Sequence, residues 1–96
     1  MKLQPHETEI IGAWVMKYGH MIADENERRI AWLIENEFKK IDTGEGGWST
    51  LYQDENDHRL WELTYPRSEM HGGGPRRIAI VSLDQVAMKY GLGRFA

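Results

Sequence analysis

The segment His71-Gly72-Gly73-Gly74 has the letters of the oxyanion-hole loop of lipases and esterases, in which backbone N–H groups face a developing negative charge. That chemistry also requires a nucleophilic serine in the pattern Gly-x-Ser-x-Gly, and none of Ser49, Ser68 and Ser82 stands in it. The glycines are therefore expected to form a sharp turn between two strands, because glycine adopts backbone conformations that other residues avoid.

The acidic residues and histidines do not have the spacing of metal ligands. Asp54, Asn56 and His58 alternate as in a calcium-binding loop, but Arg59 occupies the sixth position, where glycine is needed. Tyr65 occupies the twelfth, where a bidentate glutamate belongs. The four histidines have no zinc-like spacing and the chain has no cysteine. We therefore expect no metal site and no cofactor.

An enzymatic alternative stays open. Folding could gather His58 and His71 with Glu62 or Glu69 beside the glycine turn, which would suit a small hydrolase or a ligand-binding protein. The structural interpretation is that the same stretch is a packing motif. In either case the segment of interest comprises Trp61, Glu62, Tyr65, Glu69, His71, Gly72, Gly73, Gly74 and Pro75.

Carboxylates are concentrated in two short stretches, residues 24–27 and residues 54–57. Several carboxylates within four residues would complement a basic protein surface and would speed its association by electrostatic attraction. A capped helix start and a polar hairpin loop explain the same two stretches without any partner.

One strong helix is predicted over about residues 25–42. Asp24 and Glu27 have the spacing of a capping box, and apolar residues then recur on one stripe of the helix as far as Ile41. Glu37 falls on this stripe, where it could be a buried functional carboxylate. The favoured interpretation is that it pairs with an arginine of the sheet or lies at the stripe's solvated end.

Trp32 falls on the polar side of this helix. Two interpretations are equally supported. The indole could anchor a protein interface, or the N-terminal segment with Leu3 and Pro5 could cover it.

Strands are predicted over residues 10–16, 48–53, 59–65 and 78–81, with the Tyr18-Gly19 turn after the first. The polar residues 54–58 join the second and third of these strands as a hairpin. Ser82 and Gln85 cap a short second helix.

The strand over residues 59–65 alternates clearly. Trp61, Leu63 and Tyr65 are expected to face the long helix. Glu62 then lies on the opposite face, where it would bind a partner or pair with Arg59, Arg76 or Arg77.

Length and composition bound the fold. Ninety-six residues that are 41% hydrophobic and lack cysteine fit one domain without disulfide bonds, covering residues 1–96. We predict the α+β class: a mostly antiparallel sheet of about four strands, with one long and one short helix packed on one face. No signal peptide or membrane helix is expected, so the cytoplasm is the expected compartment.

Charge is distributed unevenly along the chain. Residues 1–58 hold six basic and twelve acidic side chains, whereas residues 59–96 hold six basic and three acidic ones. The basic residues occur only as scattered pairs, which argues against nucleic acid as a ligand. A basic protein partner suits the acidic half better.

The chain resembles the immunity protein 27 family of bacterial polymorphic toxin systems over about residues 7–90. The specific part of the resemblance is Trp61-Glu62-Leu63-Thr64-Tyr65-Pro66-x-Ser68-Glu69-x-His71-Gly72-Gly73-Gly74-Pro75. Weaker parts are Ile11-Gly12-x-Trp14, residues 24–30 and Gly47-Trp48-x-x-Leu51-Tyr52. In the hairpin, His58 stands where the family pattern would have glycine.

This resemblance implies a small antidote that binds a cognate toxin effector, blocks it and has no catalytic residues of its own. An acidic inhibitor would suit a toxin that attacks nucleic acid, because such a toxin needs a basic cleft. The expected toxin contacts are the carboxylates of the two acidic stretches and the indole on the helix: Asp24, Glu25, Glu27, Trp32, Asp54, Glu55 and Asp57.

Overall fold

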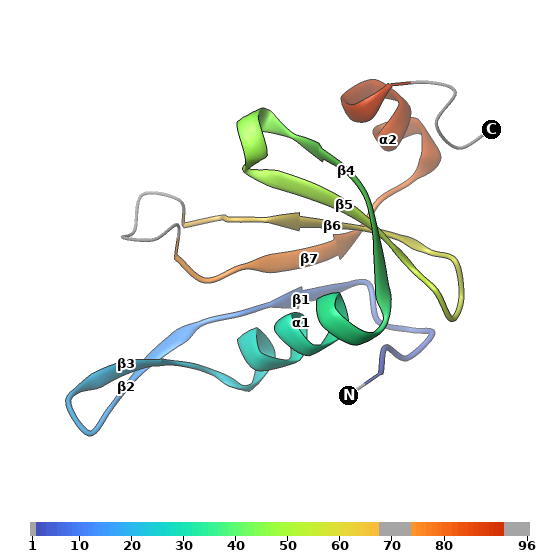
Figure 1. Ribbon diagram of the computed structural model, residues 1–96. Coiled ribbons are helices and arrows are strands. Elements are labelled where there is room, and N and C mark those ends of the chain that lie inside the picture. Colours follow the sequence, from blue (N-terminus) through green and yellow to red (C-terminus); the bar gives the residue numbers. More distant parts are fainter. Residues whose placement is uncertain (1, 68–73, 92–96) are drawn as a thin grey trace.

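The computed structural model describes residues 2–67 and 74–91, and it confirms the α+β class (Figure 1). A five-stranded sheet has the strand order β1-β7-β6-β5-β4, with every neighbouring pair antiparallel, and β2 and β3 form a separate two-stranded sheet. The elements are β1 (Glu9–Ile11), β2 (Trp14–Lys17), β3 (His20–Ala23), α1 (Glu25–Asn36), β4 (Phe38–Gly44), the short 3₁₀ helix η1 (Glu45–Gly47), β5 (Ser49–Asp54), β6 (Leu60–Thr64), β7 (Arg77–Ile80) and α2 (Leu83–Tyr90).

The two helices lie on opposite faces of the sheet, so the expectation that both pack on one face is wrong. The face under α1 includes Trp61 and Leu63, as predicted, whereas Leu60 on the same strand faces α2. Successive side chains of a strand point to opposite faces of the sheet. In β5 and β6, buried apolar residues occur at consecutive positions, so both faces of these strands are apolar. The α1 cluster is Ile10, Ile30, Leu33, Phe38, Tyr52, Trp61, Leu63 and Ile78, and the α2 cluster is Leu51, Leu60, Val86 and Tyr90.

The long helix begins where the sequence predicts but ends six residues early. Asp24 caps it, since the Asp24 carboxylate accepts a hydrogen bond from the backbone N–H of Glu27 at 2.8 Å. Glu37 closes the last turn, and residues 38–44 form β4, which pairs with β5. Phe38 and Ile41 fit a helical stripe, but both are also good strand formers, and pairing with β5 decides the outcome.

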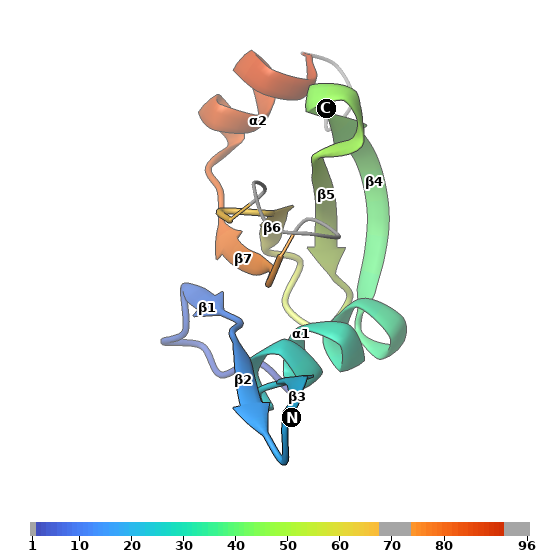
Figure 2. The ribbon, with the colours of Figure 1, turned by 90° about the vertical axis from the view of Figure 1, so that its left-hand side faces the viewer.

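The strand predicted over residues 10–16 is two separate strands. The backbone N–H of Gly12 bonds to the carbonyl of Arg76 at 2.8 Å, and the chain then leaves the main sheet. Residues 14–17 pair instead with residues 20–23 across the predicted Tyr18-Gly19 turn, where both residues have positive φ, as a type I′ hairpin turn requires. Figures 1 and 2 show this hairpin extending away from the five-stranded sheet.

The hairpin between β5 and β6 is confirmed by their antiparallel pairing. His58 in its loop has a φ of 65°, which is a left-handed conformation. Glycine adopts that conformation most readily, so His58 occupies a position where a glycine would be less strained. The second helix also follows its prediction, with a complete capping box between Ser82 and Gln85.

Candidate functional site

The start of α1 holds three of the expected toxin contacts, and the fold uses two of them internally. Asp24 accepts hydrogen bonds from the backbone of Glu27 and, at 3.1 Å, from the backbone of Ala13. Glu27 is only 8% exposed, and its two carboxylate oxygens accept from the side chain of Arg76 at 2.6 Å and the backbone of Arg76 at 3.0 Å. Glu25 is exposed, so it is the carboxylate of this stretch that a partner can reach.

The hairpin loop 54–57 shows the same division. Asp54 is 3% exposed and accepts from the backbone and side-chain N–H groups of Asn56, at 2.9 and 3.1 Å. Asp57 is exposed, but its carboxylate accepts hydrogen bonds from the backbone N–H and the guanidinium of Arg59. Burial opposes its charged form, yet these bonds keep the pKa of Asp57 below its ordinary value. Glu55 is exposed.

The two acidic stretches lie at opposite ends of α1. Asp24 caps the start of the helix, whereas the backbone N–H of Glu55 bonds to the carbonyl of Glu37 at the helix end, at 2.9 Å. A helix rises about 1.5 Å per residue, so about 20 Å separates the stretches along the axis. They do not form one continuous acidic patch.

Glu37 and Trp32 are both partly buried. The Glu37 carboxylate accepts from the side chain of Asn56 at 2.5 Å and lies 3.9 Å from the ammonium of Lys2, so its partners are an amide and a lysine instead of an arginine. Trp32 and Leu3 both pack against the core cluster under α1, which favours a structural role for the indole.

Glu62 fastens α2 to the sheet. Its carboxylate accepts from the hydroxyl of Tyr90 at 2.7 Å and pairs with the ammonium of Lys89 at 2.8 Å, and the Tyr90 hydroxyl also bonds to the hydroxyl of Ser49 at 3.0 Å. Burial raises the pKa of Tyr90 to about 12, and the bond to Glu62 adds to the shift. Burial opposes the charge of Lys89, but its contacts with Glu45 and Glu62 raise its pKa.

The expected pairing of Glu62 with an arginine is therefore wrong. The three candidate arginines each have another carboxylate: Arg59 pairs with Asp57, Arg76 with Glu27 and Arg77 with Glu9.

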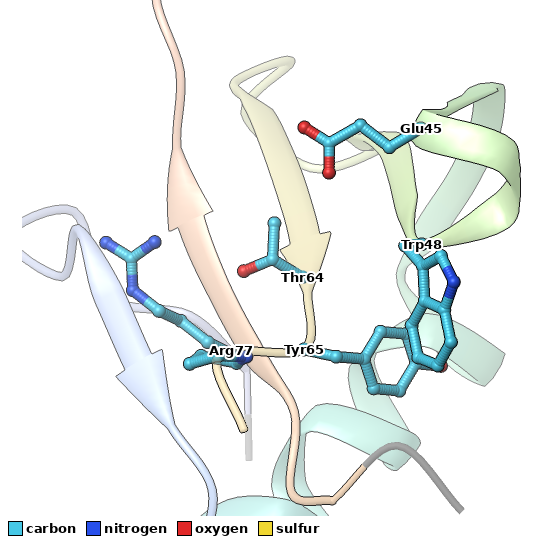
Figure 3. A pocket seen from close by; sticks show the side chains of 6 residues that line it. Glu45, Trp48, Thr64, Tyr65 and Arg77 are labelled. Carbon is cyan, nitrogen blue, oxygen red and sulfur yellow. The ribbon is translucent and has the colours of Figure 1, made fainter. Parts of the chain in front are cut away.

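A groove of about 760 Å³ opens beside the end of β6 (Figure 3). Trp48 and Tyr65 lie side by side in its wall and meet edge to face, with ring centroids 5.4 Å apart (Figure 3). Its charged residues are already paired, Glu45 with Lys89 and Arg77 with Glu9. The lining residues are Glu45, Trp48, Thr64, Tyr65, Pro66 and Arg77.

The enzymatic alternative gains little from this geometry. Of its residues, Tyr65 lines the groove, Trp61 is core, Glu62 is held by α2, and Glu69, His71, Gly72 and Gly73 lie outside the described residues. His58 lies in the hairpin loop, at the other end of β6 from Tyr65. Within the described ranges, no group of three His, Asp or Glu side chains could hold a metal ion.

The hairpin of β2 and β3 is a surface that sequence reasoning missed. Apart from Trp14, which is partly buried, its large apolar side chains face solvent, with Met16 66% and Tyr18 90% exposed. The apolar letters of residues 10–16 predict one continuous strand there and do not indicate an exposed hairpin. The two-residue Tyr18-Gly19 turn between two four-residue runs was the signal that could have revealed it.

Comparison with known proteins gives one match. The family model described as Immunity protein 27 matches residues 16–82, which is most of the chain. No curated protein matches, and neither does any solved structure. In the part of the chain that the structure describes, neither helix is long and apolar enough to cross a membrane.

Proposed function

This chain belongs to the immunity protein 27 family, and from that membership we propose that it neutralises a bacterial toxin by binding it and covering its active site. The family match is the observation that carries the proposal. The geometry supports binding over catalysis, because three pairs of polar side chains are engaged in contacts that hold the fold together: Glu27 with Arg76, Glu62 with Tyr90, and Asp57 with Arg59.

The exposed carboxylates give the proposal its electrostatic component. Glu25 and Glu55 are solvent-exposed at the two ends of α1, and Asp57 is exposed beside Glu55. Carboxylates at the rim of an interface speed association with a basic partner, such as a toxin that attacks nucleic acid. Asp24, Glu27 and Asp54 support this surface from within the fold.

The test uses the toxin domain encoded beside this gene. Its activity should fall to the background as the immunity protein approaches one molecule per toxin. Full toxin activity in the presence of excess protein would overturn the proposal.

The electrostatic component has its own test. Glu55→Gln should slow association at low salt and lose this effect at high salt, because salt screens exposed charges. Asp84→Asn removes an exposed carboxylate from the start of α2 and is the matched control. Equal association rates for the two variants would show that Glu55 is not at the rim of the interface.

A further inference from the structure

The hairpin of residues 14–23, called the arm below, presents apolar side chains on both of its faces. Met16 pairs with Met21 across the strands, and Val15 pairs with Ile22. Cross-strand partners share a face and successive residues alternate, so the two pairs lie on opposite faces. All four side chains are exposed. The arm therefore covers no core of its own, on either side.

The arm is nevertheless held firmly at its root. The backbone N–H of Asp24 bonds to the carbonyl of Ala13 at 2.9 Å, and Arg28 donates to the carbonyl of Ala23 at 2.8 Å. Gly12 lies against Glu27, so closely that a Cβ added there would be 2.3 Å from a Glu27 carboxylate oxygen. The Glu27–Arg76 pair thus packs against the chain at the root of the arm.

An exposed hairpin with these properties is suited to binding. An isolated two-stranded hairpin is only marginally stable in water, and a set of exposed apolar side chains marks an interaction site. Because its root is fixed, the arm loses less conformational freedom on binding than a flexible loop would. Its methionines adapt to irregular apolar surfaces.

The two apolar faces indicate the shape of the partner. A flat surface would cover one face and leave the other in water, whereas a cleft covers both faces and the Tyr18 tip at once. A second copy of this chain offers the groove at Trp48 and Tyr65, but Glu45 and Arg77 also line that groove, so its walls are not apolar on both sides. Such an arm-to-groove contact would also be heterologous.

The charge of the arm indicates which groups line the bottom of the partner's cleft. Residues 12–23 include Lys17 and His20 and contain no aspartate or glutamate, although the whole chain has a net charge of −3. Lys17 lies opposite His20 next to the turn, so its positive charge is at the tip. Complementary charge requires carboxylates deep in the partner.

We propose that the arm inserts into an apolar cleft of the toxin whose floor carries carboxylates. This inference rests on the proposed function, since it takes the toxin as the partner. The arm is the main anchor of the complex, and the exposed carboxylates near α1 act on the rate of association.

Each face of the arm can be tested separately with the neighbouring-gene toxin domain as the probe. The first variant is Met16→Thr with Met21→Thr, and the second is Val15→Thr with Ile22→Thr. Threonine keeps the strand propensity while removing apolar contact. Each variant should weaken binding by about thirtyfold or more, as expected when interface hot spots are lost. Met88→Gln, at a 90% exposed residue of α2, is the control and should bind like the wild type.

Thermal unfolding separates binding from folding, since the substituted side chains are exposed and the midpoints should stay near that of the wild type. Lys17→Glu should weaken binding as well, because it brings a negative charge to the acidic floor. Hydrogen exchange of residues 14–23 should slow when the toxin is bound.

Three outcomes would overturn the inference. If either double variant binds like the wild type, no cleft grips both faces. If the wild type is a dimer that the arm variants convert to monomers with unchanged toxin affinity, the arm binds a second copy. If the wild-type protein does not bind the toxin at all, the proposed function fails and the arm inference fails with it.

Discussion

Replacing Glu27 with glutamine tests whether this carboxylate supports the fold or contacts the toxin. Both of its oxygens accept hydrogen bonds from Arg76, and glutamine keeps one acceptor while turning an N–H group toward the other donor. Leaving a largely buried donor unpaired costs about 1 to 3 kcal/mol, and losing the charge adds to this. Because a quarter of the Arg76 side chain is exposed, solvent limits the total to about 2 to 4 kcal/mol.

In a domain of this size, 1 kcal/mol shifts the thermal midpoint by about 4 to 8 °C, so Glu27→Gln should lower it by roughly 10 °C or more. Glu25→Gln, two residues earlier on the same helix and exposed, should lower the midpoint less, by about 1 to 8 °C, since an exposed charge near a helix start contributes only about 0.3 to 1 kcal/mol. Scanning calorimetry measures both. A double-mutant cycle with Arg76→Gln should show a destabilisation smaller than the sum of the single effects. An unchanged midpoint together with weaker toxin binding would refute this reasoning and make Glu27 a contact residue.

Two further predictions concern the core and the N-terminal segment. Trp61 is fully buried and stacks on Phe38 at 6.2 Å, so Trp61→Ala should cost about 3 to 5 kcal/mol and leave much of the protein unfolded at 37 °C, as circular dichroism would show; an unchanged midpoint would contradict it. The hydrogen bonds from Arg29 lower the pKa of Glu7 from 4.5 to about 2. A depressed folded-state pKa gives stability that is present above pH 4.5 and lost as the pH falls toward 2. The stability difference between wild type and Glu7→Gln, measured by urea unfolding, should therefore shrink as the pH falls from 4.5 toward 2. A difference that stays constant over this range would refute the stabilising pair of Glu7 and Arg29.

Several features of this protein follow from residues that are close together in the sequence. The cap of α1 at Asp24, the capping box at Ser82 and the turn at Tyr18-Gly19 depend on contacts within about four residues, and all three are confirmed. The alternation around Trp61 correctly places Trp61 and Leu63 in the cluster under α1, whereas Tyr65 lines the groove instead. Local signals of this kind are sufficient because the interacting groups are fixed by the chain itself.

Other features depend on groups that only the fold brings together. Residues 38–44 suit a helix and a strand equally, and pairing with β5 selects the strand. The second face of β5 and β6 is covered because α2 returns to it, which no local pattern reveals.

The candidate site, too, depends on groups that only the fold brings together. Spacing identified the acidic residues, but it could not show which of them are free, because Glu27 meets Arg76 from 49 residues away. Nor could it show that the apolar letters around Met16 face solvent, since a core strand and an exposed arm have the same composition. Burial and pairing are properties of the assembled molecule, and in this protein they decide which residues remain available to a toxin.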